Sequence, residues 1–194
     1  MKYEDMKKKL QSRLKPGRYE HSLGVADTAA FLAERFHVDV EKARTAGLLH
    51  DCARQYANED MLAEAQRRHI AIGQVERAMP LLLHAYIGAR LVAEEYGVME
   101  AEISQAIWRH TVGGTDMTAL DKIIYFADMI EPGRDYPQVE ELRRLSREAS
   151  LGEMVLAGMD QSINFVVAKG HLLHPDTIAA RNTILLEQMK SSLD

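Results

Sequence analysis

Histidine and aspartate residues with apolar or small neighbours recur along this chain at widely separated positions. His50 and Asp51 form a dyad that follows Leu48 and Leu49. A His-Asp pair alone is weak evidence of a site, because a chain with eight histidines contains one by chance about as often as not. The signal lies in the full set, whose other members have similar surroundings: His21, His84, His110 and Asp128.

These six side chains are all polar or ionisable, and their apolar surroundings suggest that they are buried. Burying imidazoles and carboxylates without partners is costly, whereas a divalent metal gives them one common partner. Mixed imidazole and carboxylate ligation suits iron, manganese or zinc, and fits an all-oxygen magnesium site poorly. A structural zinc site would normally use several cysteines, and the chain has one, Cys52. The set therefore predicts a catalytic metal site that lowers the pKa of bound water, with Asp51 as the natural bridge if two ions bind.

The elements that must position these residues are helices, because apolar residues recur at spacings of three and four and strand-like alternation is hard to find. The expected fold class is therefore all-α. Proline, glycine and capping residues suggest where the helices begin and end. We expect helices over about 3–14, ended by Pro16-Gly17; about 19–35; from a cap at Asp39 to near His50; from a cap at Asn58; from Pro80 to Gly97; from about Glu100 to near His110; from a cap at Thr118 to Glu131-Pro132-Gly133; and two or three more, the last starting at Pro175.

Composition bounds the class of protein. With 194 residues, 46% hydrophobic and 27% charged, we expect one globular domain over 1–194, with a metal-binding core at about 18–135 and C-terminal helices at about 136–194 packed on it. A net charge of −5 argues against nucleic acid as a partner, and no apolar run approaches a membrane span. The single cysteine and the absence of a signal-like N-terminus favour a cytoplasmic location.

The segments that contain the six residues resemble a known family. The order H…HD…H…H…D resembles the HD-domain superfamily of metal-dependent phosphohydrolases. RYEHSLGVADTA, GLLHDCAR, WRHTVGG, LDKIIYFADMIEPGRD and the C-terminal LLHPDTIAARN further resemble the bacterial YqeK-like family of symmetrical diadenosine tetraphosphate hydrolases. The similarity extends over nearly the whole chain, and DKIIYFADMIEPGRD is its most specific part.

The resemblance implies an HD-domain helical bundle and an enzyme that cleaves diadenosine tetraphosphate into two ADP. It implies a dinucleoside polyphosphate or ADP-like ligand and one or two divalent metal ions, iron first, with manganese or cobalt as the other choices. In the implied mechanism, hydroxide generated at the metal attacks a phosphate in line while nearby cations neutralise the leaving phosphate. A homodimer follows from the family analogy only.

The resemblance also implies roles for individual residues. His21, His50, Asp51 and Asp128 are the implied metal ligands, and Asp51, His84 and His110 are implied to be catalytic and to hold a second metal if one binds. At position 54 the family more often has lysine than the arginine found here. The implied contacts to phosphate or nucleotide are Arg18, Arg54, His84, His110, Thr111, Arg134, Gly170, His171, His174 and Pro175.

Two other functions are compatible with the same residues. One is an HD-type phosphatase that acts on other nucleotides, and the other is a non-catalytic nucleotide-sensing HD module. The YqeK-like C-terminal half argues against the first, and the complete set of metal ligands argues against the second. Turnover of diadenosine tetraphosphate to two ADP separates all three.

Overall fold

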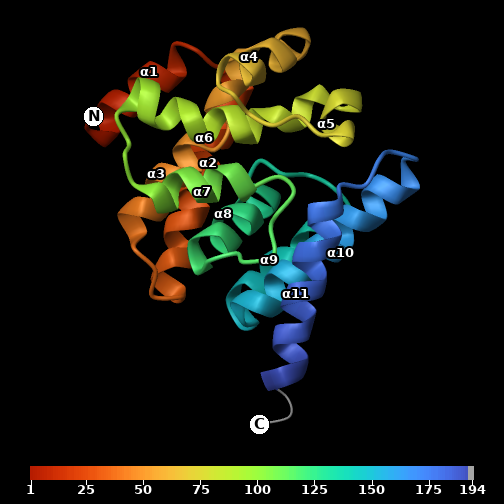
Figure 1. The fold of residues 1–194 in the computed structure, drawn as a ribbon. Coiled ribbons are helices and arrows are strands. Elements are labelled where there is room, and N and C mark those ends of the chain that lie inside the picture. The colour runs from red at the N-terminus through yellow and green to blue at the C-terminus, as the bar shows by residue number, and fades with distance from the viewer. Residues whose placement is uncertain (192–194) are drawn as a thin grey trace.

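A computed structural model describes residues 1–191 of the chain. Within these residues, eleven α-helices and three short 3₁₀ helices follow one another without a strand, which confirms the all-α expectation (Figure 1). The elements are α1 (Tyr3–Gln11), α2 (Pro16–Arg35), α3 (Val40–Leu49), η1 (Cys52–Gln55), η2 (Asn58–Asp60), α4 (Met61–Arg67), α5 (Gln74–Ala78), η3 (Pro80–Leu82), α6 (Leu83–Tyr96), α7 (Ala101–Arg109), α8 (Ala119–Ile130), α9 (Val139–Glu148), α10 (Leu151–Ala168) and α11 (Pro175–Ser191).

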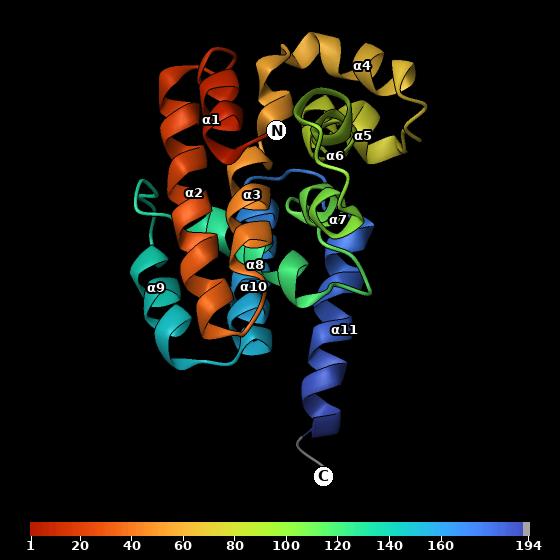
Figure 2. The same ribbon diagram turned by 90° about the vertical axis from the view of Figure 1, so that its left-hand side faces the viewer.

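Small side chains let α2 and α3 pack closely, so that the two helices lie side by side (Figure 2). Ala26 and Ala29 are buried on α2. A Cβ atom built on Gly47 of α3 would lie 2.9 Å from the Cα atom of Ala26. Helix α8 packs against both α2 and α3. The close packing of α2, α3 and α8 therefore brings the predicted metal ligands on or next to these helices close together.

Local sequence signals define the ends of these helices. The side chain of Asp39 accepts a hydrogen bond from the backbone N–H of Lys42 at the start of α3, and Thr118 and Asp121 form a capping box at the start of α8. Gly97 follows α6 with a φ of 66°, a left-handed conformation that favours glycine. These three boundaries confirm the predictions made from the sequence.

Two predicted boundaries are wrong in detail. The sequence predicts that Pro16 ends the first helix, whereas α1 ends at Gln11 and Pro16 is the first residue of α2. Proline suits this position because its missing N–H would have no helical partner there. The sequence also predicts a helix cap at Asn58, but the caps of η2 and α4 involve no side-chain hydrogen bond, and Asn58 is itself the first residue of η2.

The C-terminal helices join the same apolar core. Met154 and Met159 of α10 and Ile184 of α11 are buried in it. A Cβ atom on Gly158 would lie 2.9 Å from the sulfur of Met129 on α8, so α10 approaches α8 closely. Helix α11 begins at Pro175, as predicted, and its later turns project beyond the other helices (Figures 1 and 2).

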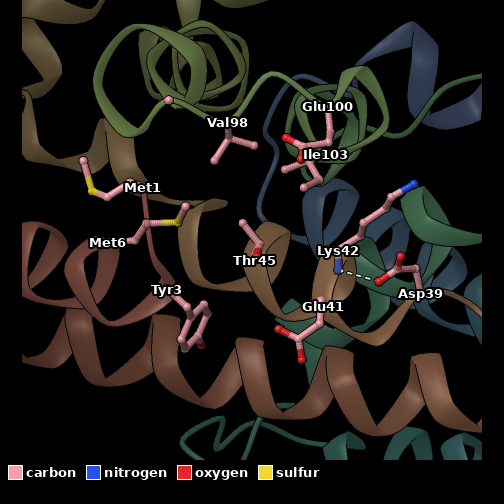
Figure 3. A pocket seen from close by; sticks show the side chains of 11 residues that line it. Met1, Tyr3, Met6, Asp39, Glu41, Lys42, Thr45, Val98, Glu100 and Ile103 are labelled. Carbon is pink, nitrogen blue, oxygen red and sulfur yellow. Dashed lines mark hydrogen bonds between the residues drawn. The ribbon is translucent and has the colours of Figure 1, made fainter.

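Over residues 1–191, none of the helices has both the length and the apolar character needed to cross a membrane. A cavity of about 420 Å³ lies between the start of α1, the start of α3 and the connection from α6 to α7 (Figure 3). Its polar wall includes Asp39, which is already hydrogen-bonded to the N–H of Lys42. None of the six predicted metal ligands lines this cavity.

Candidate metal centre

Five segments of the chain bring the six predicted ligands together. His21 lies in the second turn of α2, the dyad follows α3, and His84 lies at the start of α6. The remaining two are His110, directly after α7, and Asp128 in α8. The side chains of His50 and His110 are almost fully enclosed, at 0% and 1% exposed. Helices far apart in the sequence therefore converge on one buried polar cluster.

The first ligand group comprises His21, His50, Asp51 and Asp128. The Nε2 atoms of His21 and His50 lie 3.2 Å apart. Nε2 of His21 lies 3.0 Å from Oδ1 of Asp128, and Nε2 of His50 lies 3.5 Å from Oδ2 of Asp51. Two atoms bound to one ion at about 2.1 Å and at right angles would lie roughly 3.0 Å apart. The spacing therefore fits a shared metal ion.

The second ligand group comprises Asp51, His84 and His110. The Nε2 atoms of the two histidines lie 3.0 Å apart. Oδ1 of Asp51 lies 3.2 Å from Nε2 of His84 and 3.9 Å from Nε2 of His110. The other carboxylate oxygen of Asp51 faces the first ligand group, so this residue joins the two groups.

The orientation of the imidazoles is fixed through their other nitrogen atoms. Nδ1 of each of three histidines hydrogen-bonds to a main-chain carbonyl three residues earlier: His50 to Gly47 at 2.7 Å, His84 to Leu81 at 2.5 Å and His110 to Ile107 at 2.7 Å. Nδ1 of His21 lies 3.0 Å from Oε1 of Glu131. A carbonyl or carboxylate oxygen can only accept, so Nδ1 carries the hydrogen and the Nε2 lone pairs face inward.

The converging lone pairs are the structural evidence that a cation belongs here. Nε2 of His84 and Nε2 of His110 approach within 3.0 Å, and two neutral acceptors at that distance repel each other. With four imidazole nitrogens and two carboxylates gathered in two groups that share Asp51, the donor set matches the ligands of iron, manganese or zinc. The residues present therefore fit a divalent metal ion.

Burial and mutual contacts favour the metal-binding protonation states of His50, Asp51 and His110. Burial lowers the pKa of His110 to about 3 and also lowers the pKa of His50. Burial would raise the pKa of Asp51, but the nearby His50 and His84 outweigh it and hold that pKa well below its usual range. Neutral imidazole and ionised carboxylate are the forms that bind metals.

Three predicted arginines surround the centre in different ways. Nη1 of Arg18 donates to Oδ2 of Asp51 at 2.8 Å. Arg134 donates from Nε to the backbone carbonyl of Asp128 at 2.7 Å and also pairs with the Asp128 carboxylate. Arg54 is half-buried, and its charge faces Asp51 and Asp128 from beyond ion-pair distance. Of these three arginines, Arg54 is therefore the one with a guanidinium that makes no hydrogen bond or ion pair with a described residue.

The other predicted contacts divide into two sets. The hydroxyl of Thr111 lies 3.1 Å from Nε2 of His110 and 3.4 Å from Nε2 of His84, at the edge of the second ligand group. Gly170, His171 and His174 belong to the connection from α10 to α11, and Pro175 is the first residue of α11. In the described chain, none of these four residues makes a hydrogen bond or ion pair with the six ligands.

Two glutamates that support the site or its surroundings were not predicted from the sequence. Glu131 holds Nδ1 of His21, and the EPG turn that contains it reads from sequence only as the end of a helix. Glu76 accepts a hydrogen bond from His174 over a separation of 98 residues. No local pattern marks Glu76, because its partner is brought to it by the tertiary fold.

The family profile described as the HD domain matches residues 18–133. Two similar proteins carry the name bis(5'-nucleosyl)-tetraphosphatase, symmetrical. One, from Halalkalibacterium halodurans, is 36% identical over 88% of this chain and 90% of its own length. The other, from Bacillus subtilis, is 37% identical over 91% of this chain and 94% of its own. A crystal structure from Clostridium acetobutylicum, titled a predicted HD superfamily hydrolase involved in NAD metabolism, has a TM-score of 0.92 and 39% identity, and covers 96% of this chain and 98% of that one.

Proposed function

The chain belongs to the HD-domain family, and we propose that it is a metal-dependent hydrolase that cleaves diadenosine tetraphosphate symmetrically into two ADP. Its relatives named symmetrical bis(5'-nucleosyl)-tetraphosphatase align over about nine-tenths of the chain. The observation that carries the proposal is the position of Asp51, whose two oxygens face two separate sets of imidazoles.

The proposed resident metal is iron, with manganese or cobalt as substitutes. The first ligand group would hold one ion, and the second group would hold another through the shared Asp51. Imidazole and carboxylate ligands of this kind favour such ions over magnesium. When bound, the metal would polarise a phosphate oxygen and make hydroxide available at neutral pH.

Residues around the centre would bind and orient the phosphates. In this proposal Arg54 binds a non-reacting phosphate, because its guanidinium has no hydrogen-bonded or ionic partner in the described chain and faces the cluster. Arg18 and Arg134 lie beside Asp51 and Asp128 and neutralise charge on neighbouring phosphates. An acidic chain with a net charge of −5 needs such local cations to accept a polyphosphate.

Other groups would act during cleavage itself. Asp51 would either orient the attacking hydroxide or accept its proton. His84 and His110 lie on the opposite side of Asp51 from His21, where these two histidines, or the second ion that they would hold, would face the phosphate that leaves. Symmetrical cleavage requires attack of hydroxide on a phosphate next to the central bridging oxygen. The bond from that phosphorus to the bridging oxygen breaks, so one ADP leaves with the bridging oxygen and the other ADP carries the oxygen from water.

The test is to incubate the purified chain with diadenosine tetraphosphate and iron, manganese or cobalt, and to separate the products by chromatography. Two molecules of ADP per substrate is the expected result. AMP with ATP would contradict symmetrical cleavage, and the absence of turnover with all three metals would favour a sensing module. The homodimer and the cytoplasmic location stay predictions that this experiment does not address.

A further inference from the structure

An apolar pocket of about 170 Å³ opens beside the second ligand group. Thr111 connects the two, because it lines the pocket and its hydroxyl lies 3.1 Å from Nε2 of His110. Met79 and the buried Tyr125 also line the pocket. The rest of its lining includes the end of α10 with Leu172, Leu173 and His174, called the outer wall below because it contains the exposed Phe165 and Leu172. A group held at the metal centre could therefore extend directly into this pocket.

The outer wall includes a short segment, 171–174, with a defined path. Gly170 has a φ of 65°, and the N–H groups of Gly170 and His171 donate to the carbonyls of Val167 and Val166. This is the hydrogen-bond pattern of a Schellman motif, which ends α10 and redirects the chain. Pro175 then begins α11. The segment is thus anchored to a helix at each end.

His174 adds a third anchor, which ties the segment to α5. Its Nδ1 accepts a hydrogen bond from the backbone N–H of Asp176 at 3.1 Å, so the hydrogen of the neutral ring lies on Nε2. That nitrogen donates to Oε1 of Glu76 on α5 at 3.0 Å. The side chains of His174 and Glu76 are 11% and 9% exposed. Both ring nitrogens are therefore occupied, which makes His174 a poor direct ligand for a substrate.

Glu76 is itself held in place from a second side. The hydroxyl of Tyr86 on α6 lies 3.5 Å from Oε1 of Glu76, and the Tyr86 ring packs on Trp108 with their centroids 4.4 Å apart. Helix α6 also carries His84. The pair formed by Glu76 and His174, called the clasp below, therefore connects the outer wall of the pocket to a helix that supplies a metal ligand.

We propose that Glu76 is a positioning residue, which acts through His174 to fix the segment 171–174 as the wall of a pocket for one nucleoside of the substrate. This inference rests on the proposed function, because the occupant is the nucleoside next to the phosphates at the metal centre. The pocket is well below the roughly 300 Å³ at which drug-sized sites begin, so it accommodates one ring system rather than the whole dinucleotide. Its apolar lining suits a base, and Thr111 lies where the base joins the phosphates.

Glu76→Ala removes the carboxylate of the clasp. His174→Ala removes the imidazole of the same pair and replaces the first variant if Glu76→Ala does not fold. Glu76→Gln keeps an acceptor for the His174 N–H. Glu64→Ala is the matched control, because Glu64 is a similarly buried carboxylate that pairs instead with Arg67 of α4 and with Arg68 directly after this helix. For each variant, bound metal, KM and kcat for diadenosine tetraphosphate, and Kd for ADP and for inorganic pyrophosphate are measured.

We expect either alanine variant at the clasp to raise KM and the Kd for ADP about tenfold, with kcat, bound metal and the Kd for pyrophosphate close to those of the unaltered chain. Glu76→Gln should recover most of the ADP affinity, and Glu64→Ala should behave like the unaltered chain. Equal weakening of ADP and pyrophosphate, or an unchanged Kd for ADP, would overturn the proposal. If the proposed function is wrong, the unaltered chain will not form ADP from diadenosine tetraphosphate. The binding of ADP to the variants tests the pocket independently of that result.

Discussion

Nε2 of His84 and Nε2 of His110 lie 3.0 Å apart, although each ring already donates its Nδ1–H to a main-chain carbonyl. Two lone pairs at this distance need a cation or a proton between them. Burial lowers the pKa of His110 to about 3, which disfavours the proton at neutral pH. The arrangement therefore favours an ion in the second ligand group in addition to one in the first.

From this geometry we expect two metal ions per chain in protein purified without chelator. His84→Ala should lose about one ion because the first ligand group does not include His84, whereas Asp51→Ala should lose both ions and almost all activity because it removes the shared ligand. Elemental analysis by mass spectrometry measures the ratio. The same metal content in His84→Ala and in the unaltered chain would show that His84 holds no ion.

Glu131 offers a test of the support behind a ligand. Its Oε1 lies 3.0 Å from Nδ1 of His21, and a Cβ atom on Gly24 would lie 2.6 Å from its other oxygen. Gly24→Ala should displace this carboxylate and, like Glu131→Gln, weaken metal binding or activity by about 10- to 100-fold. Titration of the metal-free chain with manganese measures the loss.

Gly17→Ala is the control for Gly24→Ala. Gly17 lies in the same helix, and a Cβ atom there would meet no atom within 4 Å. Alanine favours a helix over glycine by up to about 1 kcal/mol, so this variant should keep its metal affinity and melt no lower than the unaltered chain. Equal metal affinity in the Gly24 and Gly17 variants would show that Glu131 tolerates the displacement.

The sequence singled out six histidines and aspartates by their types and their apolar neighbours, and the fold brings their side chains together in one cluster. Helix boundaries at Asp39, Thr118 and Gly97 also follow from local capping and glycine rules. The supporting residues were harder to find. Glu131 is 110 residues from His21, and Glu76 is 98 residues from His174. Such pairings depend on how helices pack, which periodicity along one helix does not encode.

Arg54 should affect substrate binding and leave the metals in place. It is half-buried and faces Asp51 without a direct contact, so its removal breaks no hydrogen bond in the described chain. We expect Arg54→Ala to reduce kcat/KM for diadenosine tetraphosphate by about 10- to 100-fold, the range for a charge-assisted hydrogen bond. Arg54→Lys should retain part of the activity because it keeps the charge. A loss of bound metal in Arg54→Ala would instead indicate a structural role.

The close packing of α2 and α3 predicts a loss of stability at Gly47. A Cβ atom there would lie 2.9 Å from the Cα of Ala26 and 3.0 Å from the carbonyl oxygen of Val25, and backbone atoms cannot move aside as a flexible side chain can. Gly47→Ala should therefore lower the free energy of unfolding by about 1–3 kcal/mol, as measured by urea denaturation. An unchanged midpoint would mean that the helices separate at little cost.

The clasp predicts a stability difference that depends on pH. Burial raises the pKa of Glu76, but the hydrogen bond from His174 outweighs it, so the pKa in the folded chain is below its ordinary value. The groups that face Glu76 are His174, Tyr86 and the backbone around Gly73. Because the unfolded chain binds the proton more readily, the ionised carboxylate stabilises the fold fully above about pH 5, and this contribution is lost as the pH falls through the lower folded pKa.

Glu76→Gln has no ionised carboxylate and serves as the comparison. The difference in unfolding free energy between the unaltered chain and this variant should shrink as the pH falls from about 5 toward 3. Denaturation by urea at each pH measures the difference. A gap that stays constant through pH 3, or widens, would mean that Glu76 is not held as an ionised partner of His174. In that case the contact between Glu76 and His174 would depend on packing rather than on the charge of Glu76.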